Sequence, residues 1–317
     1  MTDVATTIAE VRERVAEARR RGDRIGLVPT MGALHEGHLS LVQAARAASG
    51  YVVVSIFVNP TQFVAREDLE RYPRPLEADV AACRGAGVDL VFAPAAAEMY
   101  PATPGRSPAS PGRSPAGSVT RVSVPGLSEK MCGPLRPGHF DGVCTVVAKL
   151  FAIVQPDAAW FGEKDAQQLA IVRRMTADLN LPVEIRACPT VREPDGLARS
   201  SRNAYLSAAE RRQALVLSRA LREAEAAIRA GRRDAAAVAE AVRRRIAQEE
   251  GIELQYVAVV DPDTLEDLET IRDRVLVAVA ARVGAKRLID NVLLRDLAAA
   301  GGGSGAGGGR AESGSRS

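Results

Sequence analysis

The sequence predicts an α/β protein with a mostly parallel sheet, followed by a smaller α+β domain. In the first 190 residues, short and almost wholly apolar runs alternate with longer segments whose apolar residues recur every three or four positions. This alternation is typical of parallel strands that helices bury on both faces. After Asn203 the order changes, because two long helical patterns come first and three strand-like runs follow. With 46% hydrophobic residues in 317, the chain can build a core in each of two domains.

The first domain is expected to open with a helix over residues 6–21 that ends at Gly22. We expect its strands at residues 25–28, 51–58, 88–92, 158–161 and 183–188. We expect the helices between most of them at residues 37–48, 75–85, 141–154 and 165–179. Together these elements place the first domain at residues 1–190.

The second domain is expected over residues 191–300. Ser207 and Glu210 have the spacing of a capping box, which predicts a helix that runs to about Ala230. A second helix is expected over residues 234–250. The three strand-like runs follow at residues 254–260, 275–281 and 287–293.

Two segments have compositions that do not favour a packed structure. Residues 101–117 contain a near-duplicate of Pro-Gly-Arg-Ser-Pro-Ala and almost no apolar side chains, so we expect a mobile insertion. The tail at residues 301–317 is rich in Gly and Ser, and we expect it to be disordered. Deleting residues 101–117 is therefore expected to leave any activity largely intact.

The composition argues against several classes of protein. The 42 Lys and Arg residues nearly balance the 39 Asp and Glu residues, so we expect no nucleic-acid partner. The four cysteines form no C-x-x-C pair, which argues against a disulfide frame or a zinc knuckle. The first residues lack the pattern of a secretory signal, and no apolar run is long enough to cross a bilayer. We therefore expect a cytoplasmic protein with reduced thiols and no membrane partner.

His35 and His38 are the most informative residues of the chain. They follow an apolar run at residues 25–30, and Gly37 between them is expected to open a helix. Both imidazoles and a row of backbone N–H groups would then face one point above the carboxyl end of a strand, where α/β proteins bind phosphate. A zinc site is an alternative, but the H-E-x-x-H motif spaces its histidines four residues apart rather than three, so we expect no resident metal. Two incidental surface histidines are the other alternative.

A second expected junction between a strand and a helix contains Gly162, Glu163, Lys164 and Asp165. Lys164 can reach a phosphate, while Asp165 can cap the helix, bind a nucleotide hydroxyl or contact a metal ion. Taken alone, this run could equally be an exposed turn. Two such junctions in one parallel sheet favour a ligand site, because ligands bind where these junctions gather.

Two further patterns add polar groups. The segment 199–202 places two hydroxyls beside two guanidiniums, which suits phosphate, although a polar interdomain linker would look the same. Gln62 lies just after an expected strand, and Gln168 lies near another junction. An amide can donate to an acid and accept from an amine at once, which suits a site that holds both. Ordinary loop glutamines are the alternative.

Taken together, the histidine pair, the Lys164 junction, the segment 199–202 and the two glutamines favour a reaction in which a substrate oxygen attacks the α-phosphate of a nucleotide. The chain offers no Ser-His-Asp order, paired-carboxylate site or P-loop. It offers cations and N–H donors around a polyphosphate, which stabilise charge on the phosphorus oxygens and on leaving pyrophosphate. A substrate carboxylate is already a nucleophile, and the acyl adenylate that it forms needs only an amine held nearby.

Five ordered motifs resemble the pantothenate synthetase (pantoate–β-alanine ligase) family. They are PTMGALHEGH at 29–38, IFVNPTQF at 56–63, RPGHFDGV at 136–143, FGEKD at 161–165 and SSRN at 200–203. The resemblance runs from about residue 5 to 297 and implies a Rossmann-like nucleotidyltransferase domain, a C-terminal lid domain and a homodimer. It also implies that ATP and Mg²⁺ serve to join (R)-pantoate to β-alanine through pantoyl adenylate, releasing AMP and pyrophosphate in pantothenate biosynthesis.

The resemblance further implies roles for individual residues. His38 would be the proton donor, His35 a phosphate ligand and Lys164 a third catalytic group. Two loops, one backbone contact and a closing segment would form the ATP site: Met31, Gly32, Ala33, Leu34, His35, Glu36, Gly37, His38, Gly162, Glu163, Lys164, Asp165, Val191, Arg199, Ser200, Ser201 and Arg202. The substrates would be held by Gln62, Gln168, Tyr72 and Asn59.

Two positions depart from the family, which usually has an aromatic residue at 166 and Met or Leu at 199. Ala166 leaves space beside Gln167 and Gln168, and Arg199 adds a guanidinium. Three rival interpretations remain: a class I aminoacyl-tRNA synthetase fragment, a nucleotidyltransferase whose product stays conjugated to the nucleotide, and a nucleotide sensor without turnover. The near-neutral charge weighs against the first, and glutamines suited to an acceptor site weigh against the last.

Overall fold

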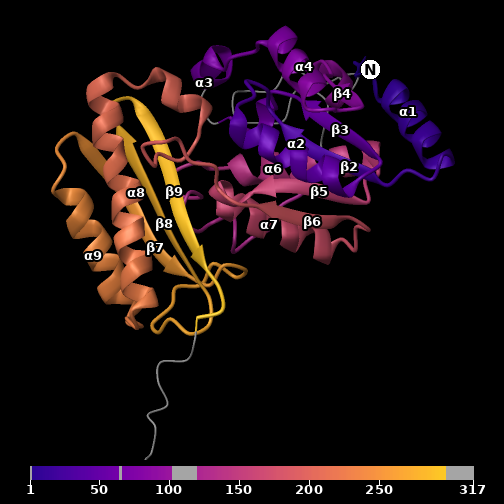
Figure 1. Cartoon of the computed structure of the whole chain (residues 1–317). Coiled ribbons are helices and arrows are strands. Elements are labelled where there is room, and N and C mark those ends of the chain that lie inside the picture. Colours follow the sequence, from indigo (N-terminus) through magenta and orange to yellow (C-terminus); the bar gives the residue numbers. More distant parts are fainter. Residues whose placement is uncertain (1, 64–65, 102–119, 298–317) are drawn as a thin grey trace, which may run out of the picture.

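The chain folds into two units that lie side by side (Figure 1). The first is a six-stranded sheet with helices on both faces, and the second is a three-stranded sheet covered by two long helices. The computed structural model describes residues 2–63, 66–101 and 120–297. The insertion expected at residues 101–117, apart from Pro101, and the tail expected at residues 301–317 lie outside the described residues.

The six-stranded sheet is parallel throughout and has the order β1-β4-β3-β2-β5-β6. Its strands are β1 (Asp3–Ala5), β2 (Ile25–Thr30), β3 (Tyr51–Ile56), β4 (Leu90–Phe92), β5 (Ala158–Gly162) and β6 (Glu184–Cys188). The last five confirm the predicted strands, with slightly different ends. Strand β1 was not predicted, because three residues are too few to show a periodic pattern of apolar side chains. The chain adds β3 and β4 on one side of β2, then returns to add β5 and β6 on the other. The order therefore reverses between β2 and β5, where such sheets bind ligands.

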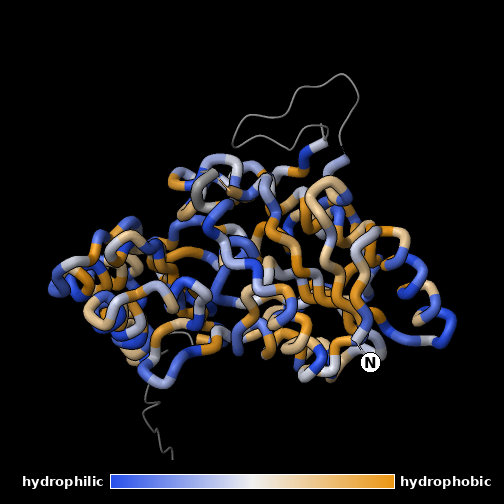
Figure 2. Tube along the Cα trace, turned by 90° about the horizontal axis from the view of Figure 1, so that it is seen from above, coloured by the Kyte–Doolittle hydropathy of each residue, from blue (hydrophilic) through white to orange (hydrophobic). Residues whose placement is uncertain are grey.

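Helices cover both faces of this sheet. They are α1 (Ile8–Arg20), α2 (Glu36–Ala48), α3 (Arg66–Arg71), α4 (Leu76–Gly85), α5 (Ala96–Met99), α6 (His139–Val154) and α7 (Ala166–Asp178), with the 3₁₀ helices η1 (Pro60–Gln62) and η2 (Glu163–Asp165). On β2, Leu27 belongs to the core with α1 and α6, whereas Val28 belongs to the core with α2 and α4. Successive strand residues point to opposite faces, which explains the wholly apolar strand runs. Figure 2 shows the hydrophobic residues concentrated along these strands.

The second unit is antiparallel, with the strand order β7-β8-β9. It consists of α8 (Ala208–Arg229), α9 (Ala235–Ala247), β7 (Ile252–Val260), β8 (Val275–Val283) and β9 (Lys286–Leu294). The predicted capping box is present, since Ser207 Oγ accepts from the N–H of Glu210 and the Glu210 carboxylate accepts from the N–H of Ser207. One face of the sheet packs on α8 and α9, and the other contacts α7 through Ala170. The sheet is thereby held against the first unit.

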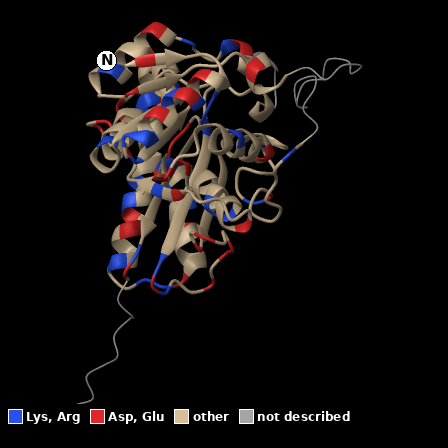
Figure 3. Cartoon of the chain, turned by 90° about the vertical axis from the view of Figure 1, so that its right-hand side faces the viewer, with Lys and Arg blue, Asp and Glu red and all other residues tan. Residues whose placement is uncertain are grey.

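Charged residues are distributed over the whole fold. Figure 3 shows positions of Lys and Arg interspersed with positions of Asp and Glu along the ribbon. All four cysteines are buried and unpaired. In the described part of the chain, no helix is both long and apolar enough to span a membrane.

Candidate active site

A pocket lies over the carboxyl ends of β2 and β5, where the strand order reverses. Most of the predicted site residues line it. They are Met31, His35, Gly37, His38, Gln62, Tyr72, Gly162, Lys164, Asp165, Gln168, Val191, Arg199, Ser200, Ser201 and Arg202. The structure therefore brings together four motifs that are far apart in the sequence.

Six predicted site residues do not line this pocket: Gly32, Ala33, Leu34, Glu36, Asn59 and Glu163. Leu34 packs against the core beneath α2, and Asn59 is buried behind Gln62. Glu36 is exposed and forms an ion pair with Arg199.

His35 and His38 cap α2 reciprocally. His35 is the N-cap residue, and its Nδ1 accepts from the N–H of Gly37 at 3.2 Å. Nδ1 of His38 accepts from the N–H of His35 at 3.3 Å, and the two rings stack with their centroids 4.1 Å apart. Because each Nδ1 is an acceptor, the proton of each neutral ring lies on Nε2. Each ring therefore keeps one donor for a ligand.

Both rings are neutral near pH 7. Burial, followed by the positive charges of Lys164 and Arg199, lowers the pKa of His35 to about 4. Burial, followed by the neighbouring His35, lowers the pKa of His38 to about 3. Because protonation is this unfavourable, the two histidines offer the pocket hydrogen-bond donors rather than full positive charges.

The backbone N–H groups that lead into α2 are already bound within the protein. Asp79 on α4 accepts from the N–H groups of Ala33 and Leu34, each at 2.8 Å, and Thr30 Oγ1 accepts from that of Gly32 at 3.2 Å. Gly32 and Ala33 have φ values of 82° and 51°, so one carboxylate holds a turn that contains two left-handed residues. The expectation that a row of backbone N–H groups faces the ligand is therefore wrong at residues 32–34. Asp79 had no local sequence signal, because its partners lie on another element.

Gln62 is held as a hydrogen-bond donor. Its Oε1 accepts from Nδ2 of Asn59 at 3.1 Å, and its Nε2 lies 3.0 Å from the sulfur of Met31. Asn59 is 1% exposed and also accepts from the hydroxyl of Tyr100 at 2.8 Å, so the orientation of the Gln62 amide is fixed. A thioether is a weak acceptor, and an oxygen of a substrate can replace it.

Arg136 and His139 line the pocket although the sequence reasoning assigned them no role. His139 donates through Nδ1–H to the backbone oxygen of Gln62 and accepts at Nε2 from Arg136, each at 2.8 Å. A guanidinium can only donate, which sets this tautomer. Burial, followed by Arg136, lowers the pKa of His139 to about 3, and burial, followed by Arg202, lowers the pKa of Arg136 to about 10. The motif at residues 136–143 was the signal that could have identified both.

Arg136 presents a positive charge that has no ion-pair partner among the described residues. Its hydrogen-bond partner His139 is neutral, and no carboxylate of the described residues lies within ion-pair distance of it. Arg202 lines the same pocket and lowers the pKa of Arg136. A half-buried charge in this state favours an anion from outside the protein.

Lys164 belongs to η2, directly after β5. Asp165 occupies the N-cap position of α7, as one alternative predicted, but its side chain makes no capping hydrogen bond there. Asp165 is exposed and, within the described residues, is the only carboxylate that lines the pocket. Its oxygens therefore remain available to a ligand.

The adjacent residues Gln167 and Gln168 point to different places. Gln167 is buried, where its amide accepts from the N–H of Cys132 and donates to two further backbone oxygens. Gln168 lines the pocket. Both also border a small neighbouring cavity together with Ala166, so the space predicted beside Ala166 is present.

A short hairpin at residues 191–199 leads from β6 toward the second unit. Arg192 and Ala198 form an antiparallel bridge, and the chain then enters the 3₁₀ helix η3 (Ser201–Tyr205). The Arg199 guanidinium pairs with Glu36 at 2.6 Å and with Glu193 at 3.2 Å. Arg199 is therefore held beside the start of α2, close to His35.

The described residues contain no group of three or more His, Cys, Asp or Glu side chains arranged to hold a metal ion. Nδ1 of His35 and Nδ1 of His38 are occupied by backbone N–H groups, and both nitrogens of His139 have partners. The donor set therefore does not favour the zinc alternative. Both rings are half-buried and line the pocket, which also argues against incidental surface histidines.

The fold and the pocket define an α/β enzyme that binds a polyphosphate nucleotide together with a small polar substrate. Comparisons with known proteins agree, because the family model for pantoate–β-alanine ligase matches residues 3–293. The chain therefore belongs to the pantoate–β-alanine ligase family, whose members form a carbon–nitrogen bond.

Individual relatives are similar over nearly their whole length. Pantothenate synthetase of Moorella thermoacetica is 56% identical over 292 residues, covering 92% of this chain and 98% of the relative. A solved pantothenate synthetase from Thermus thermophilus is 46% identical, with a TM-score of 0.82 and coverage of 92% and 98%. A ligase from Francisella tularensis, solved in complex with β-γ ATP and β-alanine, is 31% identical, with a TM-score of 0.72 and coverage of 92% and 98%.

Proposed function

We propose that the protein joins (R)-pantoate to β-alanine with ATP, through a pantoyl-adenylate intermediate. The observation that carries this proposal is the convergence on one pocket of His35, His38 and Lys164, which suit a polyphosphate, with Gln62 and Gln168, which suit a small polar acid. The donors come from both sides of the switch point between β2 and β5.

In the first step, a carboxylate oxygen of pantoate attacks the α-phosphorus of ATP. A P–O bond forms, the bond from the α-phosphorus to its bridging oxygen breaks, and pyrophosphate leaves with the electron pair. Negative charge builds on the phosphate oxygens, where the Nε2–H groups of His35 and His38 and the Lys164 ammonium stabilise it. We assign His38 as a neutral donor, because its low pKa opposes an imidazolium. The segment 200–202 completes the phosphate site.

Pantoate is held by its polar groups and its methyl groups. Gln62 and Gln168 bind its oxygens, and Asn59 keeps the donor end of Gln62 toward the pocket. An apolar wall that includes Phe57 and Val147 packs against the methyl groups of the substrate. These contacts orient the carboxylate for in-line attack.

In the second step, the free amine of β-alanine attacks the acyl carbon of the adenylate. A C–N bond forms, the bond from the acyl carbon to the phosphate oxygen breaks, AMP leaves, and the nitrogen loses a proton to solvent. The carboxylate of β-alanine requires a positive partner. Arg136 supplies it, since it lines the pocket and has no carboxylate partner among the described residues, while Arg202 beside it serves the phosphates. Tyr72 lies beside Arg202.

Magnesium would enter with ATP. Mg²⁺ is usually held by one or two carboxylates together with phosphate oxygens and waters. Asp165 offers one carboxylate in the pocket, and this carboxylate makes no capping hydrogen bond to α7. The residues present therefore fit a nucleotide-bound ion, with Asp165 as the protein ligand. When bound, the ion neutralises charge on the phosphates.

We place the nucleotide- and pantoate-binding domain at residues 1–190 and the lid domain at residues 191–300, since the 191–199 hairpin separates the two sheets.

We also propose a cytoplasmic homodimer, as the family resemblance implies. Sedimentation of the purified full chain at micromolar concentration tests this assembly, and a monomeric mass would overturn it.

The decisive experiment follows an isotope. Pantoate labelled with ¹⁸O in its carboxylate should give AMP that carries one labelled oxygen, because the carboxylate oxygen remains on phosphorus when the C–N bond forms. AMP should form only with pantoate present, and pantothenate only after β-alanine is added. Unlabelled AMP, or AMP release that ignores pantoate, would exclude the mechanism. A nucleotide-conjugating enzyme would release pyrophosphate without AMP, and a sensor would release neither.

A further inference from the structure

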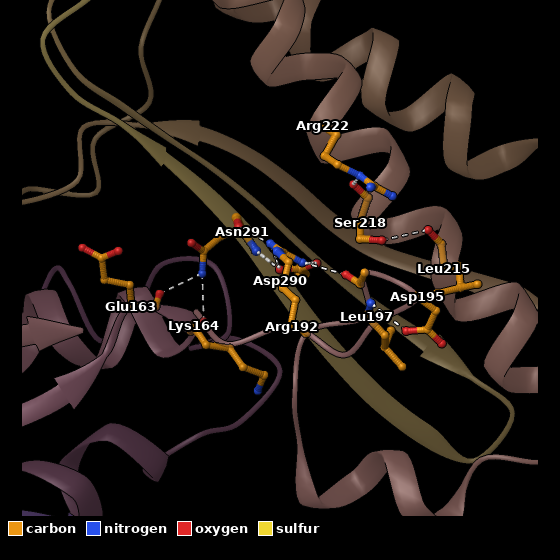
Figure 4. A network of polar contacts seen from close by, with 12 residues as sticks. Glu163, Lys164, Arg192, Asp195, Leu197, Leu215, Ser218, Arg222, Asp290 and Asn291 are labelled. Carbon is orange, nitrogen blue, oxygen red and sulfur yellow. Dashed lines mark hydrogen bonds and ion pairs between the residues drawn. The ribbon is translucent and has the colours of Figure 1, made fainter. Parts of the chain in front are cut away.

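Asn291 on β9 connects the second unit to the turn that carries Lys164 (Figure 4). Its side-chain Nδ2 donates to the backbone oxygens of Glu163 and Lys164, at 3.0 and 2.9 Å. Asn291 is 5% exposed and does not line the main pocket. Figure 4 shows the Lys164 side chain leaving the turn on the side away from Asn291. The amide therefore holds the backbone of the turn without touching the ammonium group.

The other side of this contact is tied to the 191–199 hairpin. The N–H of Asn291 donates to Asp290 Oδ1 at 2.8 Å, and the Asp290 carboxylate binds both terminal nitrogens of Arg192, at 2.8 and 3.0 Å. Arg192 also donates to the backbone oxygens of Asn291 and Gly196, each at 3.2 Å. Asp290 is 3% exposed, so the carboxylate of this ion pair is buried, while the Arg192 side chain remains partly accessible to water. A bidentate ion pair of this kind fixes the relative orientation of the guanidinium and the carboxylate.

The hairpin and the Lys164 turn form two walls of the same pocket. Val191 and Arg199 line it from the hairpin, and Lys164 lines it from the turn. We propose that Asn291, supported by Asp290 and Arg192, is a positioning residue that sets Lys164 relative to the phosphate-binding segment 199–202. This inference rests on the proposed function and adds a connection through which the second unit controls where the ammonium lies.

The chemistry of the contact explains why an asparagine stands here. Two backbone oxygens must each receive a hydrogen bond, and the side-chain amide of Asn supplies two N–H donors at one short reach. A carboxylate of the same shape would place oxygen against oxygen in a buried position, and leucine would donate nothing. Asn291→Asp and Asn291→Leu therefore remove the same contact by different means.

A double-mutant cycle tests the proposal through pantoate-dependent AMP formation. Asn291→Asp and Asn291→Leu should each lower kcat/KM for ATP roughly 10- to 100-fold, the scale expected for a displaced catalytic group. In the Lys164→Ala background, the same changes should cost less than about twofold, because Asn291 acts through the ammonium that is then missing. Equal losses in both backgrounds would overturn the proposal, since they would indicate a general structural role.

Arg295→Ala is the matched control. Arg295 pairs with the Glu163 carboxylate of the same turn at 2.9 Å, but its side chain is half exposed and does not touch the turn backbone. It should leave kcat/KM for ATP within about twofold of the wild type. A loss that equals that of Asn291→Asp would also count against the proposal.

A second variant and a second readout keep the test decisive. If the Asn291 variants do not fold by circular dichroism, Asp290→Asn enters the same cycle, because it keeps Asn291 and weakens its tie to Arg192. If the wild type makes no pantoate-dependent AMP, the proposed function fails. In that case the Kd for ATP is measured by calorimetry for the same four proteins. If the losses of binding free energy in Asn291→Asp and Lys164→Ala simply add in the double variant, the positioning role is still overturned.

Discussion

Arg199 and Glu36 form an ion pair of 2.6 Å that links the hairpin segment to the first residue of α2. The Glu36 side chain is 66% exposed and that of Arg199 33%. Arg199 also contacts Glu193, so two carboxylates hold a guanidinium that the family resemblance implies for the ATP phosphates. We therefore expect ATP and Glu36 to compete for the same cation.

Glu36→Gln should strengthen ATP binding. An exposed ion pair contributes about 0.2–1 kcal/mol, so releasing Arg199 should lower KM for ATP by at most about fivefold. The gain should vanish in the Arg199→Met background, where no guanidinium remains to turn toward phosphate. Steady-state kinetics of the four proteins measure this. A higher KM in Glu36→Gln alone would contradict the competition, because it would show that the ion pair helps ATP to bind.

Two substitutions of His38 should separate its capping role from its donor role. Asparagine can place an oxygen near the position of Nδ1, so His38→Asn should keep the cap on His35 and lose the donor. We expect nearly unchanged thermal stability and a roughly 10²- to 10³-fold fall in kcat. Glutamine reaches the Nε2 position instead, so His38→Gln should keep more activity and lose about 0.5–2 kcal/mol of stability. Full activity in His38→Asn would refute the donor assignment.

Asp79→Asn should disturb the loop that presents the histidines. One backbone N–H would then face an amide NH₂ group, which leaves two donors opposed in a buried position. We expect a loss of about 1–3 kcal/mol in the free energy of unfolding and a roughly tenfold fall in kcat. Glu77→Gln, on the exposed side of α4, is the control and should change stability by less than about 0.5 kcal/mol. Indistinguishable urea melts and rates would contradict this role for Asp79.

His139 should make the protein less stable in acid. Its pKa falls from 6.5 to about 3 on folding, mainly through burial, so its neutral ring favours the folded state fully above pH 6.5. That contribution is lost as the pH falls from 6.5 toward 3, because only the unfolded chain takes up the proton. The difference in unfolding free energy between the wild type and His139→Gln should therefore shrink by about 1.4 kcal/mol per pH unit below pH 6. Urea titrations at pH 7, 6 and 5 measure it, and a constant difference would exclude the effect.

The fold class was predictable because its signals are local. The apolar runs that became β2, β3 and β5 are continuous since helices bury both faces of each strand, and the Ser207 capping box lies within four residues. The same is true of the site motifs, which directly follow β2 and β5. Parallel strands bring such segments to one edge of a sheet whatever their separation in sequence.

The partners of those motifs were not predictable, because they come from distant elements. Asp79 binds a loop 46 residues before it, and Asn291 binds a turn about 127 residues before it. No periodicity reports such contacts. The two neighbours Gln167 and Gln168 were equally ambiguous, since only the packed helix shows which of them enters the pocket.

The fixed amide of Gln62 has a consequence for the order in which substrates bind. One side of its oxygen is occupied by Asn59, while its nitrogen faces only the sulfur of Met31. In the empty protein Gln62 therefore presents a donor to the pocket, which suits the oxygens of an acid better than an ammonium group. We expect the acid to occupy this position before the amine enters, so that the nucleotide reacts with an acid that is already held.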